Sequence, residues 1–206
     1  MSKKLITKNH KYLENSIEDI IKYGIEIISF KSIESKILPL KEKSIIIEGL
    51  LLRACAIWEK FLETEVVYLV NIDRSKLMKE FEISSNRSLN LNIIKAILFS
   101  NKYRDFHDIE RSKSFFKRYI VDDYNLFSKL TSEQINKIKM VYKLRNYLAH
   151  YSEFSKKLLL TEYRQTYNYS KFLEPGKFLI KNNGTHFENL IHNFCLISAT
   201  MERYLK

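Results

Sequence analysis

Apolar residues recur at three- and four-residue steps along most of the chain, which is the spacing of one face of an α-helix. The first such stripe covers about residues 11–30 and runs from Leu13 to Ile28. A second, over about residues 44–70, has a wider apolar face around Trp58, as expected for a helix at the centre of a bundle. The pattern therefore predicts two long helices, of which the second is central.

Shorter periodic stretches between residues 71 and 130 alternate with polar connections, and a firm helix start follows them. Thr131 with Gln134 matches a capping box, in which the side chain of each residue bonds the backbone N–H of the other. We therefore expect a helix that begins at this pair and runs to about residue 152.

The C-terminal part of the chain combines an irregular stretch with a final helix. Thr185 with Glu188 repeats the helix-start signal, which predicts a last helix over about residues 186–204. Before it, Pro175 and Gly176 separate two short apolar runs. Their turn-forming character predicts either a small hairpin or an irregular flap before the last helix.

The composition agrees with a helical protein. Glycine (4) and proline (2) are scarce, whereas a strand-rich sandwich would need a turn about every ten residues. The predicted fold class is all-α, a helical bundle in one domain that spans residues 1–206. Cys55 and Cys195 lie within apolar helical patterns, which favours two buried thiols in a reducing cytoplasm over a disulfide framework or a metal site.

The charge balance is strongly basic. The chain has 35 Lys and Arg against 24 Asp and Glu, a net charge of +11, which favours a polyanionic partner such as RNA, DNA or an anionic membrane, although the same charge serves solubility. The apolar run over residues 44–70 is interrupted by Glu48, Arg53 and Glu59, so it fails as a membrane span. No uninterrupted apolar segment follows the N-terminal lysines, so we expect a cytoplasmic protein without a signal peptide.

The stretch KLRNYLAHYSEF, residues 143–154, places Arg145, Asn146 and His150 within two helical turns. On an ideal helix Arg145 falls inside the apolar stripe, whereas Asn146 and His150 lie together at its edge. A guanidinium among apolar neighbours needs an anion, and its planar donor fork suits a carboxylate or a phosphate. Glu59 in the central helix is the expected carboxylate, and it would also serve to orient a catalytic arginine.

These residue types together indicate RNA cleavage, although a histidine alone on a helix is more often structural. An imidazole can move the proton of a ribose 2′-hydroxyl, and a guanidinium can stabilise charge that grows on the phosphate. Cleavage by these groups needs no metal and no cofactor. Lys156 and Lys157 follow the motif and either hold flanking RNA phosphates or form a solvated face.

Two further groups of residues offer chemistry. His192 and Cys195, with His186 nearby, have a spacing that could seat a metal, but the lack of further ligands favours core packing. Tyr163, Tyr167 and Tyr169 lie near the cationic Arg164 and Lys171 in the sequence, as in a platform for single-stranded RNA. A partly buried flap on the bundle explains the same tyrosines, and we favour that interpretation.

The segment LRNYLAH resembles the R-X4-6-H motif of the HEPN superfamily (higher eukaryotes and prokaryotes nucleotide-binding), with its usual polar residue, here Asn146, after the arginine. The segment EGLLLRACAIWEKFLE, with an aromatic residue directly before a glutamate, is similar to the N-terminal helix of RiboL-PSP-like and related bacterial HEPN families. The resemblance covers about residues 44–152. It departs from one toxin subgroup, because Tyr151 follows His150 at once instead of after one intervening residue.

The resemblance implies a HEPN-like bundle and a metal-independent endoribonuclease, in which attack by the 2′-hydroxyl leaves a 2′,3′-cyclic phosphate. It assigns the chemistry to Arg145 and His150. Members commonly act as toxins held by an antitoxin or as effectors of antiphage defence, and two motif copies face each other across a homodimer. A homodimer with a composite active site is therefore expected. The alternative is a non-catalytic HEPN-like module that binds RNA, a nucleotide or a protein.

Overall fold

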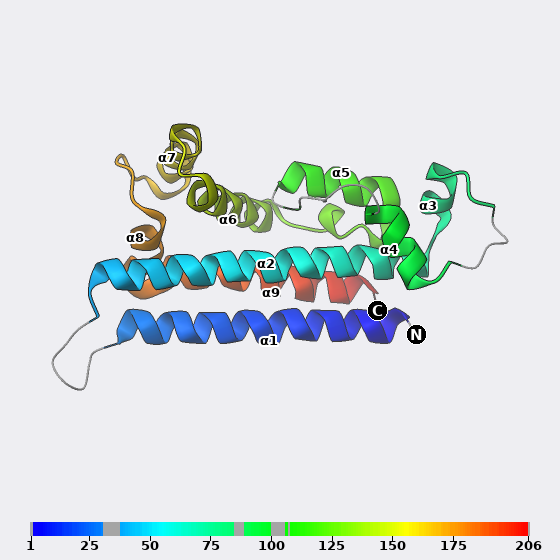
Figure 1. Ribbon diagram of the computed structural model, residues 1–206, viewed down its shortest axis with the longest axis horizontal. Helices are drawn as coiled ribbons and strands as arrows, with labels where there is room; N and C mark the ends of the chain where they lie inside the picture. Colours follow the sequence, from blue (N-terminus) through cyan, green and yellow to red (C-terminus); the bar gives the residue numbers. More distant parts are fainter. Residues whose placement is uncertain (1, 31–37, 85–88, 100–105, 107, 206) are drawn as a thin grey trace.

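Three long helices form the base of the molecule. The structure, a computed structural model, describes residues 2–30, 38–84, 89–99, 106 and 108–205, and all regular structure in these ranges is helical. α1 (Ser2–Ser29), α2 (Leu40–Ile72) and α9 (Thr185–Leu205) extend along the longest axis (Figure 1). α1 packs against both others and is antiparallel to them. The predicted all-α class is confirmed for the described residues.

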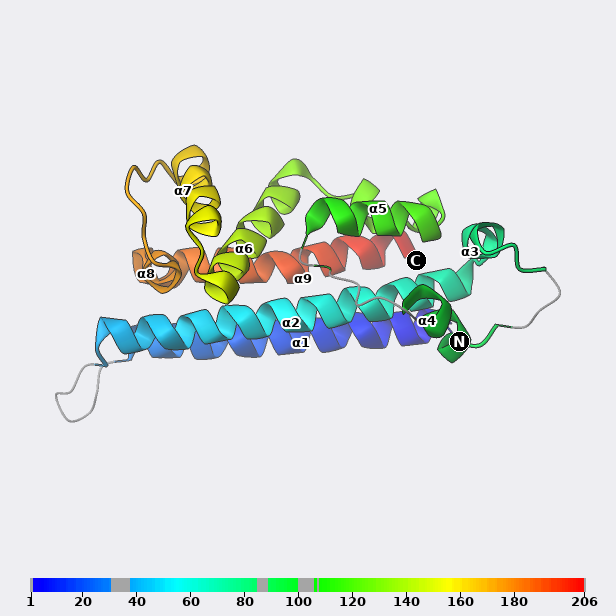
Figure 2. The same cartoon turned by 45° about the horizontal axis from the view of Figure 1, so that its top comes forward.

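The shorter elements lie over α2 and α9 (Figures 1 and 2). α3, α4 and α5 lie toward the end that holds the two chain termini, and α7 and α8 lie toward the other end. The bounds of these elements are α3 (Ser75–Glu80), α4 (Leu91–Phe99), α5 (Ile109–Tyr119), α6 (Ser132–His150), α7 (Glu153–Tyr167) and α8 (Pro175–Ile180), with 3-10 turns η1 (Asp122–Tyr124), η2 (Leu126–Ser128) and η3 (Asn182–Gly184).

α1 begins well before the predicted start because a histidine occupies a core position. His10 is 1% exposed, and its ring nitrogens hydrogen-bond the Ser198 hydroxyl at 2.7 Å and the Glu65 carboxylate at 3.2 Å. Glu65 and Ser198 are both 0% exposed. The amide of Asn9 donates to the second oxygen of Glu65 at 2.8 Å. This His10–Glu65–Ser198 network extends the buried stripe of α1 through a residue that sequence patterning treats as polar.

Trp58 joins α2 to α6 and α9 at the centre of the core. It is fully buried, and its ring stacks on Phe61 at 5.4 Å and on Phe194 at 4.8 Å between ring centroids. Its indole N–H donates to the Tyr142 hydroxyl of α6 at 3.0 Å. A buried indole with a hydrogen-bond partner adds a polar anchor to a large apolar contact. The prediction that this helix occupies the centre of a bundle is confirmed.

The capping box at the start of α6 is present as predicted. The backbone N–H of Gln134 donates to the Thr131 hydroxyl at 3.2 Å, and that of Thr131 donates to the Gln134 side chain at 3.0 Å. α9 also begins where expected, at Thr185, but the hydroxyl of this residue donates to the carbonyl of Asn182 at 2.6 Å. The position of the second helix start was predicted correctly. Its threonine hydroxyl, however, donates to a preceding carbonyl, whereas the Thr131 hydroxyl accepts from the N–H of its own helix.

The hairpin predicted before the last helix is wrong for the described residues. Pro175 and Gly176 open the short helix α8 instead of forming a turn between strands. Proline suits the first position of a helix, because that position needs no N–H donor and the fixed φ is already helical. Residues 168–174 before α8 are irregular, which agrees with the alternative of a flap.

None of the described helices combines the length and the apolar character that a membrane span requires. α2, the longest of them, buries one wide face along its length, whereas Arg53 and Lys60 on it are exposed. The prediction that this helix fails as a membrane span is therefore confirmed.

Candidate functional site

The motif residues lie at the C-terminal end of α6. The helix ends at His150 because Tyr151 adopts a left-handed conformation (φ 45°), with its N–H bonded to the Tyr147 carbonyl at 2.7 Å. Ser152 then caps α7, accepting a bond from the N–H of Ser155 at 3.1 Å. Only Tyr151 and Ser152 separate the two helices. His150 is therefore held at a sharply defined corner between α6 and α7.

The three predicted catalytic residues share the last two turns of α6 without forming one hydrogen-bonded unit. Arg145 is half-buried, and its Nη1 donates to Oδ1 of the half-buried Asn146 at 3.4 Å. His150 is exposed. Within the part of the chain that the structure describes, no hydrogen bond joins His150 to Arg145 or Asn146. The imidazole is open to solvent, while the guanidinium lies at the edge of the core.

The charges of Glu59 and Arg145 both act on the thiol of Cys55. Burial raises the pKa of the Cys55 thiol to about 12; the Glu59 carboxylate adds to this rise, and the Arg145 guanidinium opposes it. Both charges therefore act on the same buried thiol at the contact between α2 and α6. A direct ion pair between Glu59 and Arg145 stays a prediction.

Lys156 and Lys157 lie in the first half of α7, just beyond this corner. The Lys156 ammonium is 5.4 Å from the centroid of the Phe172 ring and 3.6 Å from the Glu153 carboxylate. The Phe172 ring in turn lies 5.2 Å from that of Tyr147 in the last turns of α6. Lys157 is exposed. Both amines are therefore near the end of α6, and their contact with RNA stays a prediction.

A group of carboxyl and hydroxyl groups beside the end of α6 was not predicted. Glu48 of α2 accepts a hydrogen bond from the N–H of Gly176 at 2.8 Å, and Tyr147 donates to Glu174 at 3.3 Å. A Cβ on Gly176 would stand 2.6 Å from the Ser44 carbonyl oxygen, so only glycine allows this close approach. We call the group the Glu48–Glu174 cluster; its members are Glu48, Tyr147, Tyr151, Tyr163 and Glu174.

Burial is the largest influence on the acidic groups of the Glu48–Glu174 cluster, and the charge of Glu174 adds to it. Burial raises the pKa of Glu48, the Gly176 N–H opposes the rise, and Glu174 adds to it. Burial and then Glu174 raise the pKa of Tyr147 to about 12. Among the described residues, no basic side chain forms an ion pair with either carboxylate of the cluster. Among the residues that the structure describes, the two carboxylates are thus without a cation, in a chain of net charge +11.

The tyrosines near the irregular stretch pack against other side chains of the protein and do not form an exposed aromatic surface. Tyr163 is fully buried, with its ring 4.6 Å from that of Phe178. Tyr167 packs edge-on against Phe178 at 4.9 Å, and the Tyr169 hydroxyl is 3.3 Å from Nε2 of His186. The burial expected of these tyrosines is therefore confirmed, but Tyr163 and Tyr167 belong to the helix α7, and only Tyr169 lies in the irregular stretch.

The histidines and the cysteine considered for a metal do not converge. His186 stacks on Phe178 with centroids 4.5 Å apart, and burial with the nearby Lys181 lowers its pKa. Cys195 is buried as a free thiol, but His192 is exposed, so its predicted core position is wrong. The described residues contain no group of three metal-binding side chains.

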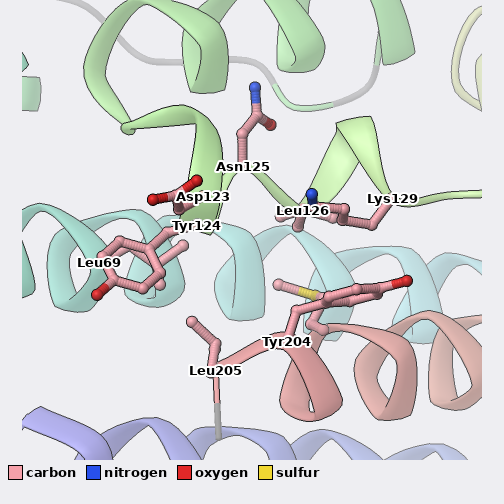
Figure 3. Close-up of a pocket in the computed structure, with 9 residues that line it drawn as sticks. Leu69, Asp123, Tyr124, Asn125, Leu126, Lys129, Tyr204 and Leu205 are labelled. Carbon is pink, nitrogen blue, oxygen red and sulfur yellow. The ribbon is translucent and has the colours of Figure 1, made fainter.

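Two hollows lie away from the motif. A cavity of about 10 Å³ beside the end of α9, shown in Figure 3, holds no more than a water molecule. An open hollow of about 710 Å³ lies where α2 meets α3. There Asp73 already accepts from the N–H of Ser75, and Arg74 donates to Asn71, both at 2.8 Å. Neither hollow is lined by a residue of the candidate site at the end of α6.

Comparison with known proteins adds no relative: no protein-family model, no curated protein and no solved structure matches the chain. The HEPN resemblance therefore depends on the two sequence segments that carry it, residues 48–63 of α2 and residues 144–150 of α6.

Proposed function

We propose that the protein is a metal-independent endoribonuclease of the HEPN type. The observation that carries the proposal is the arrangement at the end of α6, where Arg145 is bonded to Asn146 one turn before the exposed His150. His150 is the proton-transfer group, Arg145 stabilises the scissile phosphate, and Asn146 orients the guanidinium or the phosphate. The basic charge of the chain supports RNA as the substrate.

The proposed reaction begins when a neutral imidazole takes the proton of the ribose 2′-hydroxyl. The 2′-oxygen attacks the adjacent phosphorus, the bond to the 5′-oxygen breaks, and a protonated imidazole supplies the proton that the leaving oxygen needs. The products are a 2′,3′-cyclic phosphate and a free 5′-hydroxyl. Arg145 stabilises the extra negative charge on the phosphate in the transition state.

A homodimer is part of the proposal. On an ideal helix Arg145 and His150 point about 140° apart, so two-fold pairing of α6 ends brings an arginine and a histidine to one phosphate more readily than a single copy. It also supplies one imidazole as base and a second as acid. We propose that the enzyme serves as a toxin or antiphage effector, with an antitoxin or another defence partner that controls it.

The test is incubation of the purified protein with labelled RNA in excess chelator, followed by identification of the 3′ end. We expect a cyclic phosphate. His150→Ala and Arg145→Ala should each lower the rate at least about 100-fold while the helical circular dichroism is unchanged. His192→Ala is the matched control, because this histidine is also exposed and lies on another helix. Cleavage by His150→Ala at the parental rate would refute the proposal.

A second candidate is a non-catalytic module that binds RNA, a nucleotide or a protein. It is favoured by the lack of a hydrogen bond between His150 and Arg145 in the described residues, and by the exposed Tyr151 and Phe154 at the same corner. An inert protein that still retains RNA on a column would select this candidate over the nuclease.

A further inference from the structure

An apolar line of residues on α2 is exposed beside the buried face of that helix. Ile45 is 59% exposed and Leu52 is 39% exposed, and Gly49 and Ala56 are also exposed. These four residues follow one another at steps of four, three and four, so they form one line of about 16 Å along the helix. We call them the α2 stripe. Contact of such a surface with water is unfavourable, so the α2 stripe indicates a site of association.

Gly49 is not required by the packing of its own chain. Among the described residues, nothing lies within 4 Å of the point where a Cβ on Gly49 would stand. A Cβ on Gly24, by contrast, would overlap the Phe187 ring, so the fold itself requires that glycine. Glycine weakens the interior of a helix relative to alanine. A mid-helix glycine that faces open space therefore points to a close approach from outside the chain.

The end of α6 lies along one flank of the α2 stripe. Glu48, which is about 70° around the helix from the middle of the stripe, accepts from the N–H of Gly176 at 2.8 Å. Two residues earlier, Glu174 accepts from Tyr147 in the last turn of α6 at 3.3 Å. Figure 2 shows that α6 ends above the N-terminal half of α2. A partner on the stripe would therefore stand next to the corner that holds His150.

We propose that a second copy of this chain covers the α2 stripe, with the two α2 helices antiparallel about a two-fold axis that crosses them between Gly49 and Leu52. In this register Leu52 packs on the partner's Gly49, and Ile45 packs on the partner's Ala56. Each large side chain thus meets a small residue, which fills the contact closely. A parallel pair would set each residue against its own copy and leave space between the two glycines and between the two alanines.

The charges beside the stripe fit the same register. Glu42 and Lys60 are exposed and lie on one flank, at opposite ends of the stripe. Lys41 and the half-buried Glu59 lie in the same way on the other flank. A two-fold axis perpendicular to both helices keeps each flank on its own side. Glu42 therefore approaches the partner's Lys60, and Lys41 approaches the partner's Glu59, so opposite charges meet on both flanks.

The antiparallel pair also brings the two ends of α6 together. α6 ends on the flank that holds Glu48, and the axis crosses α2 in the same half, so the two corners with His150 face each other across the axis. In a parallel pair these corners would lie on opposite sides. The partner thus adds its own motif to a shared cleft. That this cleft cleaves RNA rests on the proposed function, whereas the pairing of α2 does not.

The first test is disulfide cross-linking of the full chain with Ile45→Cys and Ala56→Cys. These two positions are about 16 Å apart within one chain, too far for an internal disulfide, and both native cysteines are buried. After oxidation, the double variant should run as a covalent dimer on a non-reducing gel. Each single variant should remain a monomer on the gel, because the antiparallel register sets neither position against its own copy.

The second test uses Gly49→Gln, which adds a side chain where the chain itself leaves open space. We expect the dimer dissociation constant from sedimentation to rise at least about 100-fold, with unchanged helical circular dichroism. Leu52→Gln should act in the same direction. Leu196→Gln is the matched control, because this leucine of α9 is similarly exposed (44%) and should leave the dimer intact. RNA cleavage in chelator should fall with the dimer content of Gly49→Gln and stay unchanged in Leu196→Gln.

Four results would overturn the inference. They are a parental protein that is monomeric at every concentration, a Gly49→Gln protein that remains dimeric, covalent dimers of Ile45→Cys alone, which would show a parallel pair, and cleavage at the parental rate by monomeric Gly49→Gln. A monomeric protein whose binding to anionic vesicles is abolished by Gly49→Gln would assign the stripe to a membrane surface. Failure of the nuclease proposal is separate, because a parental protein that does not cleave RNA can still form the cross-linked dimer.

Discussion

Two polar groups inside this helical protein differ in how completely they are satisfied. In the His10–Glu65–Ser198 network, both ring nitrogens of His10 and both oxygens of Glu65 have partners, and all three named residues are at most 1% exposed. In the Glu48–Glu174 cluster, two carboxylates lack a cation among the described residues, and the Tyr163 hydroxyl lacks any partner. We call the first group closed, because its polar atoms are paired, and the second open, because some of its polar atoms are unpaired among the described residues.

The difference separates a satisfied structural network from a group with unused hydrogen-bonding capacity. A fully satisfied buried network fixes the alignment of the helices that contribute to it, here α1, α2 and α9. An incompletely satisfied group lowers stability instead. The two groups therefore make opposite predictions for substitutions that remove a polar atom.

The largest effect is expected in the closed network. Glu65→Ala leaves His10 and Asn9 buried without their acceptor, and we expect the free energy of unfolding to fall by about 3–5 kcal/mol. Urea denaturation followed by circular dichroism measures this change. Glu63→Ala is the control: it removes a partly exposed carboxylate that pairs with Lys60 and Lys95, and should cost less than about 1 kcal/mol. Similar costs for both variants would contradict a network that aligns the helices.

A smaller effect, of the opposite sign, is expected in the open cluster. Tyr163→Phe removes a buried hydroxyl that has no partner, so the free energy of unfolding should stay the same or rise by about 1 kcal/mol. Tyr142→Phe is the matched control, because it takes the acceptor from the buried indole N–H of Trp58 and should cost about 1–3 kcal/mol. If Tyr163→Phe destabilises as much as Tyr142→Phe, the hydroxyl has a structural partner and the cluster is not open.

Helix periodicity and capping signals were sufficient to predict the main elements of the fold. The capping box at Thr131 and the wide apolar face around Trp58 are local properties, so the sequence contains them in full. The start of α1 was missed because His10 looks like a surface residue until Glu65 and Ser198 are brought to it. Pairing between residues far apart in the chain is a tertiary property, and periodicity carries no signal for it.

The candidate site was predicted only in part, for the same reason. The spacing of Arg145 and His150 is visible in one segment, but the Glu48–Glu174 cluster joins α2 to the residue before α8. In the sequence, Glu48 only interrupts an apolar run, and Glu174 only precedes a proline. The ideal helix also placed Arg145 inside the buried stripe, whereas it is half-buried at the edge of the core. Helix geometry gives the direction in which each side chain points, but the packing of neighbouring helices decides which of these side chains are buried.

The smallest effect concerns the pH dependence of Glu48. Burial and Glu174 raise its pKa in the folded chain above the ordinary value of 4.5. The folded protein therefore holds this proton to higher pH than the unfolded chain, and the stabilising contribution of the protonated group is lost as pH rises through the raised pKa. Glu48→Gln keeps an acceptor for the Gly176 N–H but cannot ionise. Relative to the parental protein, its melting temperature should be higher near pH 7, and the gain should shrink near pH 4.

Glu133→Gln makes the matched comparison, because its carboxylate has the opposite shift. Lys137 lowers the pKa of Glu133 through a hydrogen bond and through its charge, so the ionised form is stabilised in the folded chain. The amide should therefore lower the melting temperature slightly near pH 7 and have less effect as pH falls through the lowered pKa. If Glu48→Gln shows the same sign as Glu133→Gln, the Gly176 hydrogen bond outweighs burial and Glu174. The Glu48 carboxylate would then be as satisfied as the Glu65 carboxylate, and the contrast between the open and the closed group would disappear.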